Sequence, residues 1–548
     1  MNEPRGIPVA VVGGGPVGML LALFLDRHGI ESVLFNTETS VPAELRGNTH
    51  NARTMEHYRT LGIAPAVRRL GLPWQHGTGI TFHTHYAGHE LCHLPWPAPG
   101  EALRRVAGAD ATDQTPEPMH RANQRFVEEL LLDQVRTRPR ITVRFGHHVT
   151  ALAEREDHVL VETEGESWRA GYVVGCDGGR STVRQHMGVR YTGEGGLQQD
   201  VLGRRATAAH LRVPGLYRDV LRERREWSHW AFNADLALNL ISINGDDEFF
   251  LLTSSVDADR TDERELARLV RRAAGLPLGV EVIGHRPWTP GAALVAERFV
   301  LGRFLLAGDA AHLFTPNGGF GMNTGVDDTA NLAWKLAAAV RGWGGPGLLA
   351  SYETERRAIA LRNTNAARGL NIGLGAIDRP AALTDDSADG REARAKAGEQ
   401  LTRYGLRTMD TLGVQLGARY DDSPVIASDG SVPPPDSFTG YTPSAVPGGR
   451  LPHVWLDEHH GPGGSIYDRL GAGFTLVDLS TDPCRVRSLS LTARARGIPL
   501  TVLRLAGDVY HDLYQRDLVL VRPDRHVAWR GNTVPEDPDV LWGRLTDR

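Results

Sequence analysis

The sequence has 548 residues, more than a single hydrophobic core usually serves, so we expect two or three domains. Its 61 Lys and Arg against 66 Asp and Glu give a formal net charge of -5, and no basic cluster stands out, which argues against nucleic acid or a membrane as a partner. The cysteines, Cys92, Cys176 and Cys484, lack metal-ligand or redox-pair spacing, so neither a disulfide framework nor a metal site is expected.

The amino-terminal segment and the hydropathy predict a soluble, cytoplasmic protein. Residues 1–15 lack a basic segment followed by an apolar run and a cleavage site, so no signal peptide is expected. No uninterrupted apolar stretch reaches the roughly 18 residues that a membrane-spanning helix needs.

Residues 7–36 predict a strand, a glycine-rich turn, a helix and a second strand. The turn, GGGPVG at 13–18, has the GxGxxG spacing that allows a tight turn, close approach of the backbone to a pyrophosphate and close packing of the helix. A glycine-rich turn that binds nothing is the alternative. The residues of the predicted dinucleotide-binding turn are Gly13, Gly15, Pro16, Val17 and Gly18.

The end of the second predicted strand lacks the acidic residue that usually binds a ribose in such sites. Asn36 holds that position, and Glu38 follows two residues later. Asn36 forms hydrogen bonds but brings no charge, so we expect a ribose contact that is weaker than usual or shared with Glu38.

A second turn follows the apolar run YVVGC at 172–176 and begins with Asp177 and Gly178. Taken alone, this stretch predicts an Asp-Gly turn in which Ser181 caps a short helix. The segment from 197 to 295 contains several strand-like runs separated by polar turns, which predicts an inserted antiparallel sheet.

The third glycine-rich segment, residues 305–336, runs from an apolar strand into Gly308 and Asp309, then a loop, then an amphipathic helix. Asp309 at the strand end is suited to accept hydrogen bonds from ribose or ribityl hydroxyls. The loop through Pro316, Gly319 and Gly321 to Asn323 gives backbone amides close access to a flat ring. The positive end of the following helix would stabilise negative charge there.

The remainder of the chain predicts helices, a linker and a further compact unit. Residues 348–371 segregate apolar and charged positions at helical spacing, whereas residues 380–398 are polar and predict a loop. Residues 428–449 are rich in Pro, Gly and Ser, as in linkers. About 100 residues follow, with three strand-like runs around short helices.

Taken together, the three glycine-rich segments resemble those of the FAD-dependent aromatic hydroxylases, the single-component group A flavoprotein monooxygenases. RGNTHNARTMEHYRTLGI from Arg46 resembles the second flavin segment of that family, and HRANQRFVEELL from His120 resembles the helix that supplies an Arg and a Gln to the cofactor. GGRLPHVWL at 448 and LVLVRPDRHVAWRG at 518 resemble the thioredoxin-like carboxyl-terminal domain of the phenol hydroxylase and polyketide hydroxylase branch. No Cys-x-x-Cys accompanies it, so a packing or dimer-contact role is expected.

The resemblance implies an α/β fold in which a Rossmann-like FAD-binding domain carries an inserted antiparallel substrate sheet, followed by a helical segment and the thioredoxin-like domain. The expected ranges are 1–75, 106–196 and 296–380 for the FAD-binding domain, 76–105 and 197–295 for the substrate domain, 381–447 for the helical segment and linker, and 448–548 for the last domain.

The resemblance also implies non-covalent FAD as the cofactor and NADPH or NADH as a transient electron donor, because no second glycine fingerprint is present. NADPH is favoured. The implied cofactor contacts are Gly13, Gly15, Pro16, Val17, Gly18, Asn36, Arg46, Arg121, Gln124, Asp177, Gly178, Asp309, Pro316, Gly319, Gly321, Met322 and Asn323.

The implied reaction transfers the distal oxygen of a flavin C4a-hydroperoxide, formed from molecular oxygen, to a small aromatic substrate: a phenol, a pyridinol or a polyketide-derived ring. A group that binds or deprotonates the substrate hydroxyl would assist. The candidates are Asn48 and His50, with Pro316 beside the ring.

Trp227, His229 and Trp230 are candidates for the substrate pocket, although aromatic residues on a strand are more often part of a core. Arg46 and Arg53 are expected on the flavin side, with salt bridges as the alternative, and His312 is expected to cap and pack.

A homodimer is left open. The alternatives in function are a non-hydroxylating FAD oxidase or dehydrogenase of the same fold and a flavin-binding scaffold.

Overall fold

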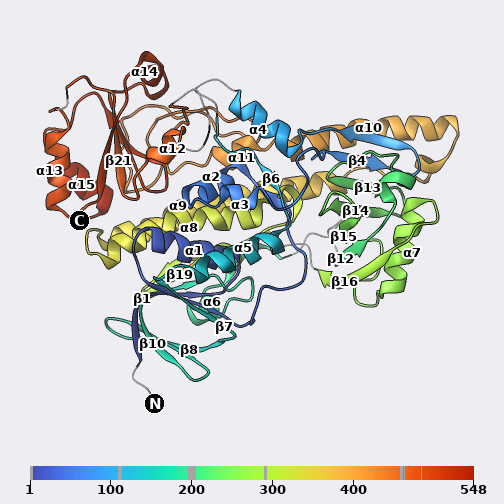
Figure 1. Ribbon diagram of the computed structural model, residues 1–548, viewed down its shortest axis with the longest axis horizontal. Coiled ribbons are helices and arrows are strands. Elements are labelled where there is room, and N and C mark those ends of the chain that lie inside the picture. The colour runs from blue at the N-terminus through green and yellow to red at the C-terminus, as the bar shows by residue number, and fades with distance from the viewer. Residues whose placement is uncertain are drawn as a thin grey trace.

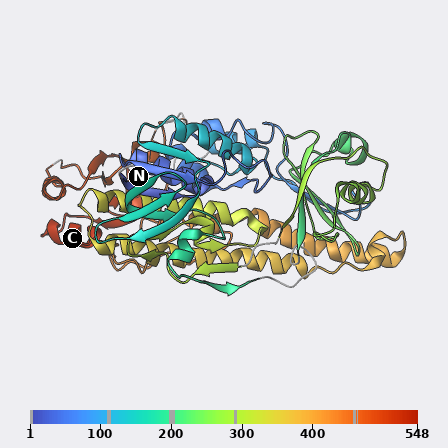
Figure 2. The same cartoon turned by 90° about the horizontal axis from the view of Figure 1, so that it is seen from below.

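The computed structural model describes residues 4–108, 114–195, 205–288, 293–456, 461, 463–482 and 484–548. Three units lie in a row in two perpendicular views (Figure 1, Figure 2). A central unit has a carboxyl-terminal unit on one side and a large sheet, the lateral sheet, on the other. The expected boundary between residues 196 and 197 lies outside the described residues.

The central unit is built on a sheet with the strand order β18-β19-β10-β1-β2-β7, to which β8 and β9 add an antiparallel extension. Its strands are β1 (Arg5–Val12), β2 (Ser32–Asn36), β7 (Ile141–Phe145), β8 (Val149–Glu154), β9 (Val159–Thr163), β10 (Ser167–Gly175), β18 (Val300–Leu301) and β19 (Phe304–Leu306). Its main helices are α1 (Pro16–Arg27), α2 (Ala52–Thr60), α3 (Ala64–Val67), α5 (Gln124–Arg136), α6 (Thr182–His186), α8 (Phe320–Val340) and α9 (Pro346–Gly375). Two small sheets add β3 (Thr49–His50), β6 (His120–Arg121), β11 (Tyr191–Glu194), β17 (Ala293–Ala296) and β20 (His312–Leu313).

The register of the parallel strands brings the three glycine-rich turns together. Val12 at the end of β1 lies opposite Gly175 of β10, and Gly175 lies opposite Leu306 of β19. The residues that follow these strands therefore leave the sheet side by side, at its carboxyl edge, where open α/β sheets bind ligands.

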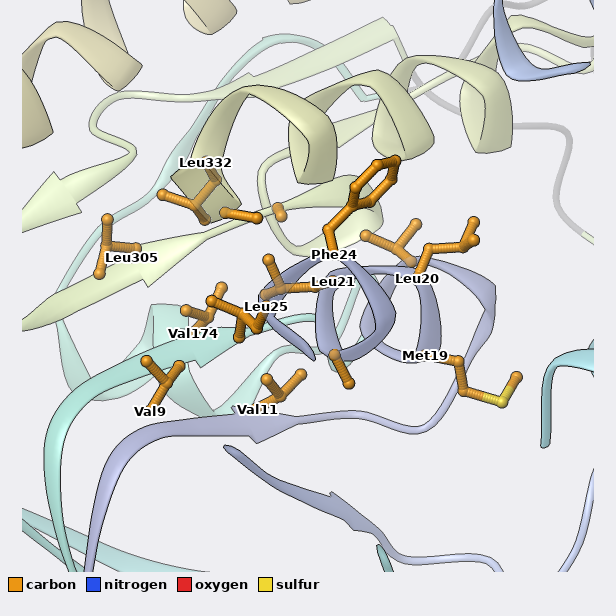
Figure 3. Packing of buried hydrophobic residues seen from close by; sticks show 14 of the residues in the cluster. Val9, Val11, Met19, Leu20, Leu21, Phe24, Leu25, Val174, Leu305 and Leu332 are labelled. Carbon is orange, nitrogen blue, oxygen red and sulfur yellow. The ribbon is translucent and has the colours of Figure 1, made fainter. Parts of the chain in front are cut away.

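Helix α1 is apolar on all sides, which predicts a helix that is buried on all sides. Every residue from Pro16 to Leu25 is buried. Figure 3 shows the helix between the sheet, represented by Val11 of β1 and Val174 of β10, and helix α8, represented by Leu332. This packing fixes the amino terminus of α1 against the carboxyl edge of the sheet.

The lateral sheet has the order β16-β12-β15-β14-β13-β4-β5 and is antiparallel except between β13 and β4, which pair in parallel. The sequence predicts an antiparallel sheet; the parallel pair arises because β4 and β5 come from a separate, earlier part of the chain. The elements are β4 (Ile80–His83), β5 (Glu90–Leu94), β12 (Ala206–Arg212), β13 (Ser228–Phe232), β14 (Ala237–Ser242), β15 (Glu248–Thr253), β16 (Glu281–Trp288), α7 (Glu263–Ala274), the neighbouring α4 (Pro99–Ala107) and the short π-helix η1 (Leu216–Val220).

The prediction of a loop over residues 380–398 is wrong. A short turn (Ala381–Thr384) leads into α10 (Ala388–Met409), capped by Ser387 and followed by α11 (Leu412–Leu416). The face of α10 that meets β5 is built largely from small residues, so it carries little hydrophobic signal. A side chain at Gly398 would come within 2.5 Å of the carbonyl of Leu91, so the close helix-to-strand contact requires glycine there.

The carboxyl-terminal unit contains a mixed four-stranded sheet, β22-β21-β23-β24, in which β21 is parallel to β22 and antiparallel to β23. This arrangement agrees with the expected thioredoxin-like unit. Its elements are α12 (Ile466–Arg469), β21 (Phe474–Asp478), α13 (Arg487–Ala495), β22 (Leu500–Arg504), α14 (Asp508–Tyr514), β23 (Leu518–Val521), β24 (Val527–Gly531) and α15 (Pro538–Thr546).

Buried ion pairs fix the carboxyl-terminal unit to the central unit. Arg522 contacts Glu355 of α9 at 2.6 Å and Asp524 at 2.6 Å, and all three side chains are almost fully buried. Lys335 of α8 approaches Glu355 at 2.6 Å. Burial alone would raise the pKa of Glu355, but Arg522 and Lys335 hold that pKa well below its ordinary value. A second contact joins Arg450 to Glu56 of α2.

A related cluster joins α2, α8 and α9 to the third glycine turn. Asp327 accepts hydrogen bonds from Arg53 and His57, and Arg356 bridges Asp327 and Asp328. Asp328 in turn accepts a hydrogen bond from the backbone of Gly308 at 3.1 Å. Arg53 therefore lies in this buried cluster, where it also donates to the carbonyl of Asp524.

No helix among the residues that the structure describes has both the length and the hydrophobicity to cross a bilayer.

We expect Arg522→Met to lower the free energy of unfolding by about 3–5 kcal/mol, because it leaves the buried carboxylates of Glu355 and Asp524 short of a partner. Urea unfolding of the full chain measures the change. Arg105→Met is the control, since Arg105 pairs with Glu101 on the surface and should contribute about 0–1 kcal/mol. Equal effects of the two substitutions would contradict a stabilising interface.

Candidate functional site

A single cavity of about 840 Å³ opens at the carboxyl edge of the central sheet and extends to the lateral sheet. One end is lined by the three glycine-rich turns and by the segment after Arg46. The other end is lined by β4, β12 to β16 and the end of α10. The cavity thus joins two units that are distant in the sequence.

The first turn follows β1 and leads into α1. Gly13 has φ +113°, and a side chain there would lie 2.3 Å from the carbonyl of Cys176. At Gly18, a side chain would lie 1.9 Å from the carbonyl of Gly13, so this glycine allows α1 to pack against the turn. Gly13 lines the cavity and Gly18 does not.

Neither the backbone conformation of Gly15 nor the protein atoms around it require a glycine at this position. It precedes α1 with φ -74°, and a side chain built there meets nothing within 4 Å. Gly15, Pro16 and Val17 line the cavity, and the amino terminus of α1 lacks a side-chain cap. The free backbone donors and the space beside Gly15 fit the pyrophosphate of a dinucleotide.

Asn36 at the end of β2 uses its carboxamide oxygen to accept a hydrogen bond from the backbone of Gly14 at 3.1 Å. Its amide donates to the carbonyl of Glu38 at 3.2 Å. Asn36 and Glu38 both line the cavity. Asn36 therefore holds the first turn, while the carboxylate of Glu38 is placed beside it.

At the second turn, the side chains of Asp177 and Ser181 cap the short helix α6, as the sequence of this stretch alone predicts. Asp177 accepts hydrogen bonds from the backbone of Thr182 at 2.6 Å and Val183 at 3.2 Å, and Ser181 accepts from Arg184. Asp177 and Gly178 nevertheless line the cavity. Burial raises the pKa of Asp177.

The third turn places Asp309 in the cavity wall. A side chain at Gly308, which has φ +60°, would lie 2.9 Å from Val17, so this turn packs directly on the first. Desolvation by the surrounding protein atoms raises the pKa of Asp309, although His312 and Arg46 oppose the rise. His312 itself is fully buried and pairs with Asp328 at 2.7 Å, as a packing role predicts.

The loop that follows becomes a short turn and then the first turn of α8. Pro316, Gly319 and Met322 line the cavity, and Gly319 precedes α8 with φ +66° and no side-chain cap. The positive end of α8 is therefore directed to the cavity wall. Gly321 lies in this first turn but does not line the cavity.

Asn323 does not line the cavity but holds the segment that does. Its amide donates to the carbonyl of Thr49 at 2.9 Å, and its oxygen accepts from the backbone of Asn51 at 3.0 Å. Asn48, in the same segment, lines the cavity and accepts a hydrogen bond from Asn123 at 2.8 Å. Arg46 also lines the cavity.

Helix α5 and the strand before it add Gln124 and Arg121 to the cavity wall. Gln124 donates to Glu128 at 2.6 Å. Arg121 stacks on the ring of Trp227, with its guanidinium carbon 3.6 Å from the ring centroid. The interaction joins the cofactor side of the cavity to the lateral sheet.

Aromatic side chains form the wall on the lateral sheet. Trp230 stacks on Phe82, with ring centroids 5.8 Å apart and planes within 14°. Trp227 and Trp230 line the cavity. The polar residues of this wall are Asn239 and Ser228, and the side-chain oxygen of Asn239 accepts a hydrogen bond from the hydroxyl of Ser228 at 2.7 Å.

Among the predicted catalytic and substrate-binding residues, His50 and His229 do not line the cavity. His50 is fully buried beside Tyr58, and burial lowers its pKa to about 3. His229 alternates with Trp230 along β13 and so points to the other face, where it contacts Thr81 and the carbonyl of Glu226. His229 forms hydrogen bonds through both ring nitrogens, whereas the Nε2 of His50 is buried without a hydrogen-bond partner among the described residues. Neither side chain reaches the cavity wall.

Sequence reasoning misses several cavity residues. Arg286 and Trp288 lie on β16, where exposed and half-buried positions alternate, but the residue types do not follow this alternation, because Ile283 is exposed and Arg286 is half-buried. Tyr404, Thr408 and Met409 come from α10, which the sequence predicts only in part. Among the described residues, no group of His, Cys, Asp or Glu is arranged to hold a metal ion.

Comparisons with known proteins agree with this geometry. The family model for the FAD binding domain matches residues 6–367, and the model for the carboxyl-terminal domain of aromatic-ring hydroxylases matches residues 444–546. The chain is 31% identical to the FAD-dependent monooxygenase apdD of Emericella nidulans, over 96% of this chain and 88% of that protein.

Two solved structures are similar along their whole length. The structure of RebC soaked with chromopyrrolic acid, with bound 7-carboxy-K252c, has a TM-score of 0.88 and 32% identity and covers 99% of each chain. The flavin-dependent monooxygenase PieE in complex with FAD and substrate has a TM-score of 0.87 and 26% identity and covers 100% of each chain.

The converging glycine turns, the space at Gly15 and the match of both family models lead to one assignment. The chain belongs to the family of FAD-dependent aromatic-ring hydroxylases and is a flavoprotein monooxygenase with FAD as its cofactor.

Proposed function

We propose that the protein hydroxylates an aromatic substrate with NAD(P)H and molecular oxygen, and that the substrate lies between the amino terminus of α8 and the lateral sheet. The observation that carries this proposal is the continuity of the cavity. One space of about 840 Å³ is bounded by the dinucleotide turns at one end and by an aromatic wall at the other.

The cofactor end of the cavity would hold FAD in an extended conformation. Gly13 and Gly15 leave room for the pyrophosphate, Glu38 is placed for the ribose, and Asp309 is placed for the ribityl hydroxyls. When bound there, FAD would supply hydride acceptance from the nicotinamide and the activation of oxygen, which is chemistry that the side chains do not supply. Arg46 and the amino terminus of α8 provide positive charge near it.

The substrate end of the cavity suits a flat, largely apolar ring system. Trp227, Trp230 and Trp288 line this end of the cavity, as does Phe82, which stacks on Trp230. Asn239 and Ser228 supply hydrogen-bonding groups that can orient a ring hydroxyl or carbonyl. Phenols, pyridinols and polyketide-derived rings all meet this description.

Of the predicted catalytic residues, Asn48 and Pro316 line the cavity. The carboxamide of Asn48 is held by Asn123, so it presents a fixed orientation toward bound ligands. We propose that Asn48 orients the substrate rather than removing its proton, because a carboxamide does not act as a base at neutral pH.

Oxygen isotope labelling tests the reaction. We expect the FAD-loaded enzyme to oxidise NADPH or NADH faster when an aromatic substrate is present and to place one atom of ¹⁸O₂ in the product, because hydroxylation draws its oxygen from O₂. Mass spectrometry of the product measures the label. A substrate oxidised without incorporation of the label would favour the alternative, an FAD oxidase or dehydrogenase.

Replacement of Gly15 tests the cofactor pose. We expect Gly15→Ala to weaken FAD binding about tenfold or more, or about 1.4 kcal/mol, while stability without FAD stays unchanged, because the added methyl group meets only the ligand. Fluorescence titration of the apoprotein with FAD measures the affinity. Gly6→Ala is the control, since Gly6 also has free space around it but lies outside the cavity. Equal FAD affinity in the two variants would exclude a pyrophosphate beside Gly15.

A further inference from the structure

Arg121 is a buried cation in the cavity wall that has no carboxylate partner among the described residues. Its exposed fraction is 6%, and no ion pair involves it in the part of the chain that the structure describes. Burial is the sole cause that acts on its pKa, and lowers it to about 9. In contrast, the equally buried Arg53, Arg356 and Arg522 each pair with carboxylates.

The contacts of Arg121 hold its guanidinium in place without neutralising it. One terminal nitrogen donates to the hydroxyl of Thr49, and the other lies 3.8 Å from the sulfur of Met409. The group is stacked on Trp227 at 3.6 Å. Its Nε–H is buried and has no partner among the described residues. An arginine has five N–H donors, so this side chain keeps most of its hydrogen-bonding capacity unused.

The charged groups nearby do not balance Arg121. His50 and His120 lie close to it, but burial lowers the pKa of His50 to about 3 and that of His120 to about 4, so both are neutral at physiological pH. Asp309 and Glu128 also line the cavity, but it is Arg46 that interacts with both carboxyl groups. Desolvation by the surrounding protein atoms raises the pKa of both carboxyl groups.

A buried and unpaired charge is destabilising, so a folded protein that keeps one has a compensating use for it. The position of Arg121 indicates that use. It lies where the cofactor side of the cavity meets the aromatic wall, with Thr49 on one side and Trp227 on the other. A planar guanidinium stacked on an indole is suited to bind a flat anion edge-on.

We propose that Arg121 binds an anionic oxygen of the substrate, a phenolate or a ring carboxylate, and so selects substrates that ionise. This inference rests on the proposed function, because it places the aromatic substrate beside Trp227. It differs from the role in FAD binding that the sequence resemblance implies for Arg121. A phenolate held here is also the more electron-rich form of a ring, which favours attack by an electrophilic oxygen.

Binding of three matched probes to the FAD-loaded enzyme tests the proposal without turnover. The probes are 2-hydroxyanthraquinone, anthraquinone-2-carboxylate and 2-methoxyanthraquinone, which share a ring system and differ in whether they carry an ionisable oxygen. We expect the wild type to bind at least one of the first two more tightly than the third. We also expect bound 2-hydroxyanthraquinone to ionise at a lower pH than in solution, because a nearby cation favours the phenolate. Difference absorbance spectra report both quantities.

Arg121→Met removes the charge and keeps an unbranched apolar side chain. We expect it to weaken binding of the preferred ionisable probe by roughly 10- to 100-fold, to leave the methoxy probe unchanged and to abolish the shift in probe ionisation. Arg121→Lys keeps the charge and should retain part of the preference. Because the variant removes a buried unpaired charge, its thermal unfolding midpoint should be at least as high as that of the wild type.

Two results would overturn the proposal. The first is that the wild type binds all three probes with equal affinity, or that Arg121→Met binds them with the same affinities as the wild type. The second is a lowered flavin midpoint potential in Arg121→Met with unchanged probe binding, which would assign the anion to reduced FAD instead. A failure of ¹⁸O incorporation with probe binding intact would count against the proposed hydroxylation alone, so the two failures are distinguishable.

Discussion

The structure depends on the close approach of three backbone turns at one edge of the parallel sheet. Strands β1, β10 and β19 are adjacent and in register, so the residues after Val12, Gly175 and Leu306 emerge together. There is no room for side chains at these turns. A side chain at position 13 would clash with the backbone of Cys176, and one at position 308 would clash with Val17. Without these glycines the turns would be forced apart, and the edge that receives the cofactor would not form.

A continuous set of buried charges supports this edge from behind. Asp328 holds the backbone of Gly308, Arg356 joins Asp328 to Asp327, and Asp327 contacts Arg53. Arg53 donates in turn to the carboxyl-terminal unit at Asp524. That unit therefore has a physical link to the flavin site, although none of its described residues lines the cavity. Arg121 differs from this set, because it faces the cavity and its charge is left for a ligand.

Much of the cofactor end could be predicted from the sequence, because its turns are local motifs whose glycines have local steric causes. The substrate end of the cavity was harder to predict from the sequence. His229 was predicted beside Trp230, but strand alternation turns the two side chains to opposite faces of β13. The sequence did not predict the first part of helix α10. The buried face of this helix is formed largely by Gly398 and other small residues, so it lacks the stripe of large apolar residues that indicates a helix.

The sequence by itself determined the order of the elements, the dinucleotide turn and the likeness to the aromatic hydroxylases, because glycine spacing and apolar periodicity are properties of short segments. Only the tertiary structure decided which charges are paired. Arg53 and Arg121 both occur in segments that resemble flavin-binding ones. Arg53 pairs with Asp327, which lies 274 residues later in the sequence, whereas Arg121 stacks on Trp227 and pairs with no carboxylate in the part of the chain that the structure describes. The partner of a buried charge depends on contacts between distant segments, and those exist only after the chain has folded.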